Sequence, residues 1–222
     1  MFPARLNASI YAFATRNFRR RRFALFQDFI AGLPRPLTVL DVGGSEAFWV
    51  QMGMGEADGV TSNDVQITLV NRFPSRAGHF PRSVAGDARG LPFPDQTFDL
   101  AFAHSVIEHM GSREGQRQMA AEVRRVARHF FVQTPNRNFP VEPHFLMPFI
   151  QFLPVEWRAR ILLGLKVEYF FERITTLTRA REVAQEIVLL NRQEFRQLFP
   201  GGRLVEEKVF GFTKSFTIFG ES

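Results

Sequence analysis

Three acidic residues stand where short β-type runs of the sequence end. Asp41 follows the run LTVL and is itself followed by Gly43 and Gly44. Asp64 follows DGVTSN, and Asp87 follows RSVAG. Glycines let a backbone approach a ligand closely, and a carboxylate can accept hydrogen bonds from two ribose hydroxyls or from an exocyclic amine. These residue types predict a nucleoside site, and three carboxylates favour a nucleoside that carries a positive charge over a pyrophosphate.

Such a site requires strands whose carboxyl ends meet at one edge of a sheet. From residue 37 to about residue 128, short β-type runs alternate with helical runs. The expected elements are strands at 37–42, 58–65, 82–88, 97–105 and 128–135, and helices at 46–53 and 113–127. This alternation is typical of a parallel sheet with helices on both faces and ligands at the carboxyl ends of its strands. We therefore predict an α/β, Rossmann-like fold in which the three acids close the first three strands.

Two segments do not follow this alternation. Residues 1–36 are predicted to form a helical lid, because apolar residues that include Phe26 and Ile30 recur at helical spacing. Residues 136–190 are predicted to be a helix-rich insertion after the fifth strand. Inserted segments over the strand ends commonly shape a substrate pocket, so we expect the acceptor to bind there.

The C-terminal part returns to regular structure. Asn191 with Glu194 resembles a capping box for a helix over 192–199, and the runs 203–211 and 214–220 read as a β-hairpin. The complete prediction is a seven-stranded, mostly parallel sheet with an antiparallel C-terminal hairpin strand.

Composition limits the classes of protein that this chain can represent. Its 222 residues suit one α/β domain, and a net charge of +6 allows attraction to a polyanion or to an anionic membrane surface. There is no cysteine, which removes disulfides, cysteine nucleophiles and cysteine-based metal sites. The scattered histidines and acids show no metal-ligand spacing, so we predict no metal site.

The sequence shows no candidate membrane span. The start of the chain does not read as a secretory signal, and the most apolar segment, 145–165, is interrupted by prolines and charges. We expect a cytoplasmic protein. Peripheral contact with an anionic membrane at its inner face is a second option, because Arg19 to Arg22 lie beside a Phe-rich stripe.

Two further runs carry a family resemblance. VLDVGG, followed later by GDARGLPFPDQTFDLAFAHSVIEHM, resembles the class I S-adenosylmethionine-dependent methyltransferases, in particular the small-molecule branch called type 11. The resemblance covers about residues 37–135 and is weaker over 191–219. It implies a methyltransferase domain at 37–222 and S-adenosylmethionine as the cofactor. The cofactor-binding residues that it implies are Asp41, Gly43 and Gly44 near the methionine portion, Asp64 and Val65 at the ribose, Asp87 and Ala88 at the adenine, and His104.

One position departs from the family pattern. Ser45 and Ala47 occupy places where the family often has glycine. Ser45 fits if its φ angle is negative, because only a left-handed backbone would favour glycine there.

The acceptor side offers two titratable candidates. Pro140 and Pro143 stiffen the backbone around Glu142 and His144. A histidine at this edge could remove a proton from an acceptor hydroxyl, since its ordinary pKa lies near neutrality. The alternative is that both residues only anchor the loop.

Several functions remain open from the sequence. The leading hypothesis is methyl transfer to oxygen, and less readily to carbon or nitrogen, of a small-molecule, glycan or lipid-linked acceptor. An RNA methyltransferase, with nucleic acid as its partner, is an alternative that the charge allows but that we do not favour. A non-catalytic binding module with the same fold is a second alternative, and a dinucleotide oxidoreductase is a distant one.

Overall fold

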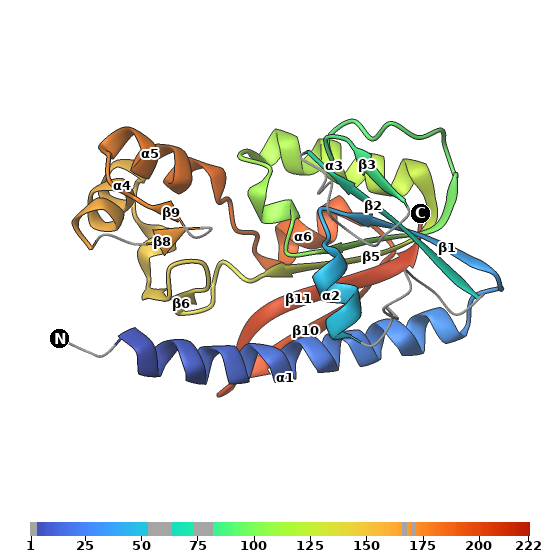
Figure 1. Cartoon of the computed structure of the whole chain (residues 1–222), viewed down its shortest axis with the longest axis horizontal. Helices are drawn as coiled ribbons and strands as arrows, with labels where there is room; N and C mark the ends of the chain where they lie inside the picture. Colours follow the sequence, from blue (N-terminus) through green and yellow to red (C-terminus); the bar gives the residue numbers. More distant parts are fainter. Residues whose placement is uncertain (1–3, 53–63, 73–81, 166–167, 170–171) are drawn as a thin grey trace.

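The computed structural model of the protein describes residues 4–52, 64–72, 82–165, 168–169 and 172–222, and in the first helix the side chains from Phe18 onward. Its centre is a seven-stranded sheet (Figure 1). In spatial order the strands are β10 (Arg203–Val209), β11 (Phe212–Glu221), β5 (Ala127–Pro135), β4 (Phe98–His104), β1 (Leu37–Val42), β2 (Val65–Asn71) and β3 (Ser83–Ala85).

In this sheet β11 runs in the direction opposite to the other strands. It pairs antiparallel with both β5 and β10, whereas β1, β2, β3, β4 and β5 pair in parallel. The parallel strands β1 and β4 are buried over most of their length, because helices cover both faces of the sheet. The Rossmann-like sheet and its antiparallel C-terminal strand are as predicted.

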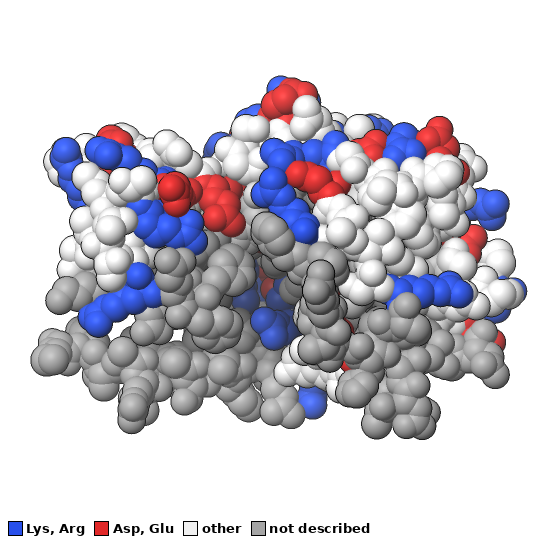
Figure 2. Space-filling view, turned by 45° about the horizontal axis from the view of Figure 1, so that its top comes forward, with Lys and Arg blue, Asp and Glu red and all other residues white. Residues whose placement is uncertain are grey.

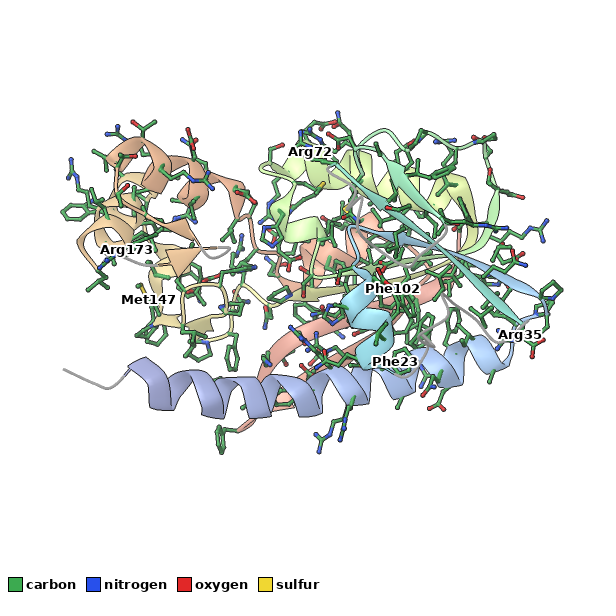
Figure 3. All side chains as sticks on the ribbon, in the orientation of Figure 1. Phe23, Arg35, Arg72, Phe102, Met147 and Arg173 are labelled. Carbon is green, nitrogen blue, oxygen red and sulfur yellow. The ribbon has the colours of Figure 1, made fainter. Side chains whose placement is uncertain are left out.

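One face of the sheet is covered by α1 (Ala4–Ala31) and the short α2 (Glu46–Gln51). Figure 1 shows α1 running the length of the sheet beneath it. Phe26 of α1 is fully buried, and its ring lies 5.0 Å from that of Phe102 and 5.4 Å from that of Phe131. Figure 3 labels Phe23 and Phe102 within this aromatic layer. The second half of α1 therefore belongs to the core, and a lid role stays a prediction for the part that reaches the carboxyl edge.

The opposite face is covered by α3 (Arg113–Val126) and α6 (Arg192–Leu198). Met119 and Val123 of α3 and Phe195 of α6 are fully buried there. The predicted capping box of α6 is present, because Asn191 accepts from the Glu194 N–H while the Glu194 carboxylate accepts from the Asn191 N–H. Local sequence thus determines where this helix begins.

The second strand is not where the sequence analysis placed it. Residues 58–63 lie outside the described part of the chain, Asp64 is in a turn, and β2 runs from Val65 to Asn71. The Asp64 carbonyl accepts from the N–H of Leu37, the first residue of β1. The prediction that Asp64 closes the second strand is therefore wrong: Asp64 and Val65 lie at the amino edge of the sheet.

The insertion after β5 forms a lobe with its own apolar core (Figure 1). Its elements are β6 (Val141–Glu142), β7 (Met147–Pro148), the 3-10 helix η2 (Ile150–Phe152), α4 (Val155–Gly164), β8 (Glu168–Tyr169), β9 (Glu172–Arg173) and α5 (Leu177–Glu186). Backbone bonds join the lobe to the sheet domain, since the Val188 N–H donates to the Glu108 carbonyl. No helix within the described ranges is long and apolar enough to span a bilayer.

Candidate active site

Two adjoining hollows lie at the carboxyl ends of the parallel strands. The glycine-loop pocket, about 410 Å³, is lined by Asp41, Gly44 and His104 among others. The strand-end pocket, about 830 Å³, is lined by Asn71, Asp87 and other residues at the ends of β2 and β3. Gly43 and Ser105 line both pockets. The two volumes are of the size that proteins use to bind cofactors.

The turn after β1 depends on its two glycines. Gly43 has a φ of +76°, a left-handed conformation that a side chain would strain. A Cβ atom built on Gly44 would lie 1.6 Å from Oδ2 of Asp41, so only glycine leaves room for that carboxylate. Ser45 has a φ of −133°, so its backbone has no need of glycine. The departure at Ser45 therefore does not distort the turn.

Asp41 is a buried acid whose carboxylate has a single side-chain hydrogen-bond partner among the described residues. The residue is 1% exposed, and its Oδ2 accepts a 2.7 Å hydrogen bond from the Trp49 indole N–H. Its Oδ1 has no hydrogen-bond partner among the described residues. Burial raises the pKa of Asp41 to about 7, although the Trp49 bond opposes this rise. A cation placed next to Oδ1 would stabilise the ionised form.

Asn71 is the polar residue that occupies the carboxyl end of β2. Its side-chain N–H donates a 2.8 Å hydrogen bond to the Gly44 carbonyl and so joins the end of β2 to the glycine turn. Figure 3 shows Arg72, which follows it, far from Arg35, which lies just before β1. Asp64 is near the amino end of β1 and does not line either pocket. Sequence reasoning missed Asn71, although the buried run VQITLV that precedes it was the available signal.

Asp87 and Ala88 line the strand-end pocket, but the Asp87 carboxylate is already engaged. Its Oδ1 accepts from the backbone N–H and from Nε of Arg89, and its Oδ2 accepts from Arg89 Nη2 at 2.6 Å. Arg72 lies 3.3 Å from the same Oδ2. The Arg89 hydrogen bonds, with smaller effects from its charge and that of Arg72, lower the pKa of Asp87 to about 2. An incoming amine must therefore replace one of these donors.

His104 closes β4 and is contacted by the N-terminal helix. Its Nε2 lies 2.8 Å from Nη1 of Arg22. A guanidinium has no acceptor, so Nε2 must be the acceptor and the proton of neutral His104 must sit on Nδ1. Burial, with the charges of Arg22 and Arg19, holds the pKa of His104 well below 6.5. His104 is thus a neutral wall of the glycine-loop pocket.

Glu142 and His144 are brought together as a pair. His144 Nδ1 donates a 2.6 Å hydrogen bond to Glu142 Oε1, and Glu142 is 2% exposed. Burial by itself would lower the pKa of His144, but the bond to Glu142 and the charges of nearby carboxylates raise it above 6.5. His109 lines the strand-end pocket, and its ring lies 4.9 Å from that of His144. The predicted acceptor-side residues, Glu142 and His144, therefore lie behind His109, which forms part of the wall of the strand-end pocket.

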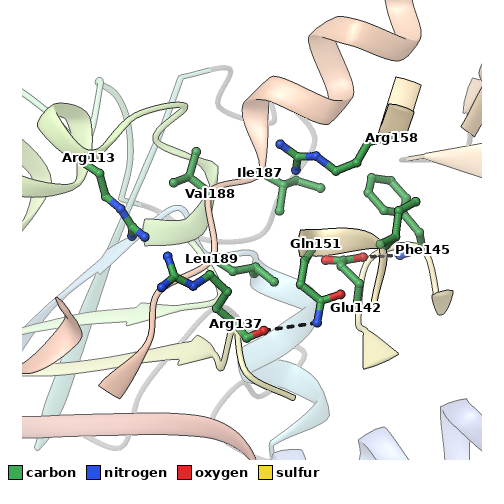
Figure 4. A pocket seen from close by; sticks show the side chains of 10 residues that line it. Arg113, Arg137, Glu142, Phe145, Gln151, Arg158, Ile187, Val188 and Leu189 are labelled. Carbon is green, nitrogen blue, oxygen red and sulfur yellow. Dashed lines mark hydrogen bonds between the residues drawn. The ribbon is translucent and has the colours of Figure 1, made fainter. Parts of the chain in front are cut away.

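A third hollow of about 170 Å³ lies between the insertion and the sheet domain (Figure 4). Arg113, Arg137 and Arg158 project around it, with the Glu142 carboxylate, Gln151 and apolar side chains between them. Arg113 and Arg137 share Oε1 of Glu194, at 2.7 and 3.1 Å. Nε of Arg158 has no partner among the described residues, and burial lowers its pKa. This arginine pocket suits a small anionic group.

Comparisons with known proteins agree with this fold. Residues 40–129 match a family described as "Methyltransferase domain". The fold is similar to a SAM-dependent methyltransferase from Methanosarcina mazei (TM-score 0.52, 13% identity, covering 85% of this chain and 93% of that one). It is also similar to 1,6-didemethyltoxoflavin-N1-methyltransferase from Burkholderia thailandensis, solved with 1,6-didemethyltoxoflavin and S-adenosylhomocysteine (TM-score 0.54, 13% identity, covering 95% and 80%). A third similar structure is the CurJ carbon methyltransferase (TM-score 0.50, 13% identity, covering 86% and 50%).

Proposed function

We propose that this chain is a class I S-adenosylmethionine-dependent methyltransferase of the type 11 branch and that it methylates an oxygen atom of a small-molecule, glycan or lipid-linked acceptor. The observation that carries the proposal is the group of histidines and carboxylates behind the wall of the strand-end pocket. An acceptor hydroxyl loses a proton as it is methylated, and these groups can assist that loss. An amine acceptor would not require them.

The two adjoining pockets fit the cofactor chemically. S-adenosylmethionine supplies a methyl group on a sulfonium, whose sulfur keeps the electron pair when the methyl passes to the acceptor oxygen. The unpartnered Oδ1 of Asp41 suits the positive charge, and the bare backbone of Gly43 and Gly44 leaves space for close approach. We assign Asn71, in place of Asp64, to the ribose hydroxyls.

Asp87 and Ala88 remain the proposed adenine site, with one modification. The Asp87 carboxylate offers about four acceptor positions, and Arg89 and Arg72 use them. Arg72 is the more distant donor, and its side chain is 67% exposed. Moving it away from Asp87 therefore costs less interaction energy than moving Arg89. We propose that the adenine amine takes the position of Arg72.

The insertion supplies the acceptor preference. Most of the large apolar side chains exposed in the described part of the chain belong to it: Leu146, Phe149, Phe152, Leu153, Trp157 and Leu165. The arginine pocket lies at the base of this lobe (Figure 4). An acceptor with an acidic group and an apolar portion, such as a lipid-linked sugar acid or a lipid phosphate, matches both features.

RNA is a weaker candidate for the acceptor. Figure 2 shows arginine and lysine side chains interspersed with acidic ones over both lobes on the face in view. Nucleic-acid binding would favour a continuous basic surface. On that face the charges do not favour a polyanion.

The test combines cofactor binding with an acceptor screen. Calorimetry should detect the binding of S-adenosylmethionine to the protein. In the acceptor screen, a labelled methyl group should appear on apolar acceptors with a free hydroxyl, preferentially those that also carry a carboxylate or phosphate. The methylated atom can be assigned by carbon NMR of the product. Product methylated only at nitrogen or carbon, or only on RNA, would contradict the proposal.

A further inference from the structure

Three side chains beside the strand-end pocket form a cluster with ligand chemistry. Glu108 and His109 come from the 3-10 helix η1 (Ile107–His109) after β4, and His144 comes from the insertion. One ligand atom of each lies within 4.8 Å of the others. Two ligands on one first-row metal ion are about 3 to 4 Å apart, so only a short side-chain movement separates this arrangement from coordination.

Glu108 gives the cluster an unused buried carboxylate oxygen. The residue is fully buried, and its Oε2 accepts a 3.0 Å hydrogen bond from the Thr134 hydroxyl. Its Oε1 has no hydrogen-bond partner among the described residues. A buried carboxylate oxygen without a partner is costly, and a cation is one way to satisfy it.

Both histidines have a carboxylate at the same ring nitrogen. His144 Nδ1 donates to Glu142, which leaves Nε2 as the nitrogen that can bind a metal. His109 Nδ1 lies 3.5 Å from Glu186 Oε1. Metal-binding histidines usually direct the second nitrogen at a carboxylate or carbonyl, which fixes the ring and makes the other nitrogen a stronger ligand.

The structure assigns a divalent transition-metal site to Glu108, His109 and His144, with Glu142 as the residue that positions His144. Imidazole ligands favour Zn²⁺, Co²⁺ or Mn²⁺ over Mg²⁺, which prefers oxygen. Three protein ligands leave further coordination positions open, and His109 places the site at the wall of the strand-end pocket. This assignment differs from the sequence-based prediction that the chain has no metal site, and it gives His144 a role other than those of candidate base or loop anchor.

The site would define how the acceptor is activated. A divalent ion lowers the pKa of a bound hydroxyl, whose proton then leaves to solvent before the oxygen attacks the methyl carbon. This role rests on the proposed function, whereas metal binding itself does not. Acceptors with two adjacent oxygens, such as a vicinal diol or an α-hydroxy acid, would benefit most because they can chelate.

The test is a Co²⁺ titration of the tag-free full chain, stripped with chelator, at about pH 8. We expect one equivalent of Co²⁺ to give visible absorption bands that Zn²⁺ abolishes. Glu108→Gln and His144→Asn should remove the bands, and Glu142→Gln should weaken Co²⁺ binding about 10- to 100-fold. His129→Asn is the matched control, because His129 lies near the start of β5, where its Nδ1 is 3.0 Å from the carbonyl of Asp99 in β4, and it is not part of the cluster.

Each outcome decides the assignment. Bands that persist in His144→Asn, or binding of Mg²⁺ alone, would overturn it. Circular dichroism and thermal melts of every variant show whether a lost band reflects unfolding, and Glu142→Gln gives a graded readout in a chain with both ligands intact. S-adenosylmethionine binding to the stripped protein is measured in parallel. If the protein binds S-adenosylmethionine but shows no Co²⁺ site, only the metal assignment is refuted. If it binds Co²⁺ but not S-adenosylmethionine, only the cofactor assignment is refuted.

Discussion

Replacing Asp41 by Asn should stabilise the fold while it weakens cofactor binding. The pKa of Asp41 rises from its ordinary value of 3.8 to about 7 because the carboxyl is buried. A carboxyl with a raised pKa stabilises the folded state at low pH, and that contribution is lost as pH rises from about 4 to about 7. Since one pH unit corresponds to 1.36 kcal/mol, keeping the ionised carboxylate buried costs up to about 4 kcal/mol at pH 8.

The Asn variant removes this cost but introduces a smaller one. Its carbonyl can still accept from Trp49, while its amide would put an unsatisfied donor where Oδ1 lies, at a cost of about 1 to 2 kcal/mol. We expect Asp41→Asn to be more stable than the wild type by about 2 to 3 kcal/mol at pH 8 and nearly equal to it at pH 5.

Urea unfolding of both proteins at pH 5, 6, 7 and 8 measures this difference. Other titrating groups cancel in the comparison, so the gap should widen by about 2.5 kcal/mol from pH 5 to pH 8. Affinity for S-adenosylmethionine should fall at least about tenfold in the same variant, because a charged acceptor is lost. A gap that does not change with pH, or a wild type that is the more stable protein at pH 8, would refute the reasoning.

Three further substitutions test other parts of the site. Asn71→Ala should weaken S-adenosylmethionine binding about tenfold, because it removes both the proposed ribose contact and the bond to the glycine turn, whereas Asp64→Ala should leave the calorimetric dissociation constant unchanged. Gly44→Ala should lower the free energy of unfolding, measured in urea, by about 1 to 3 kcal/mol, because the new Cβ would collide with the Asp41 carboxylate. Gly90→Ala is the control: a Cβ there meets open space, so its free energy of unfolding should lie within about 0.5 kcal/mol of the wild-type value. Arg22→Met should raise the pKa of His104, because a positive charge beside the ring is removed, but the pKa should stay below 6.5 because the ring remains buried. NMR titration of the His104 ring measures this change. An unchanged pKa would exclude Arg22 as a cause of the lowered value.

The elements that local sequence determines were predicted well. The run LTVLDV is β1, the capping box at Asn191 starts α6, and the C-terminal hairpin forms β10 and β11. Each depends on residues close together in the chain: a buried apolar run, a reciprocal cap or a short turn. None required knowledge of the tertiary structure.

The error at the second strand has a physical reason. Asp64 has the residue type that the family places at the end of this strand, and that expectation outweighed the local pattern. Apart from Gln66, the run VQITLV consists of apolar and β-branched residues, as is typical of a strand buried on both faces, and the strand ends at Asn71. The contacts of Asn71 with Gly44 and of His104 with Arg22 join distant segments, and only the folded structure reveals such pairs.

The charges at this edge of the sheet explain how it can prefer a sulfonium cofactor although arginines surround it. His104 is held neutral, so it adds no positive charge beside the glycine turn. Two arginines compensate Asp87, so that carboxylate contributes little net attraction. Asp41, which lines the glycine-loop pocket, combines deep burial with an oxygen that has no hydrogen-bond partner among the described residues. In a poorly solvated position its charge acts strongly on a nearby cation, so the free protein bears the cost of this buried acid and a positively charged ligand relieves it.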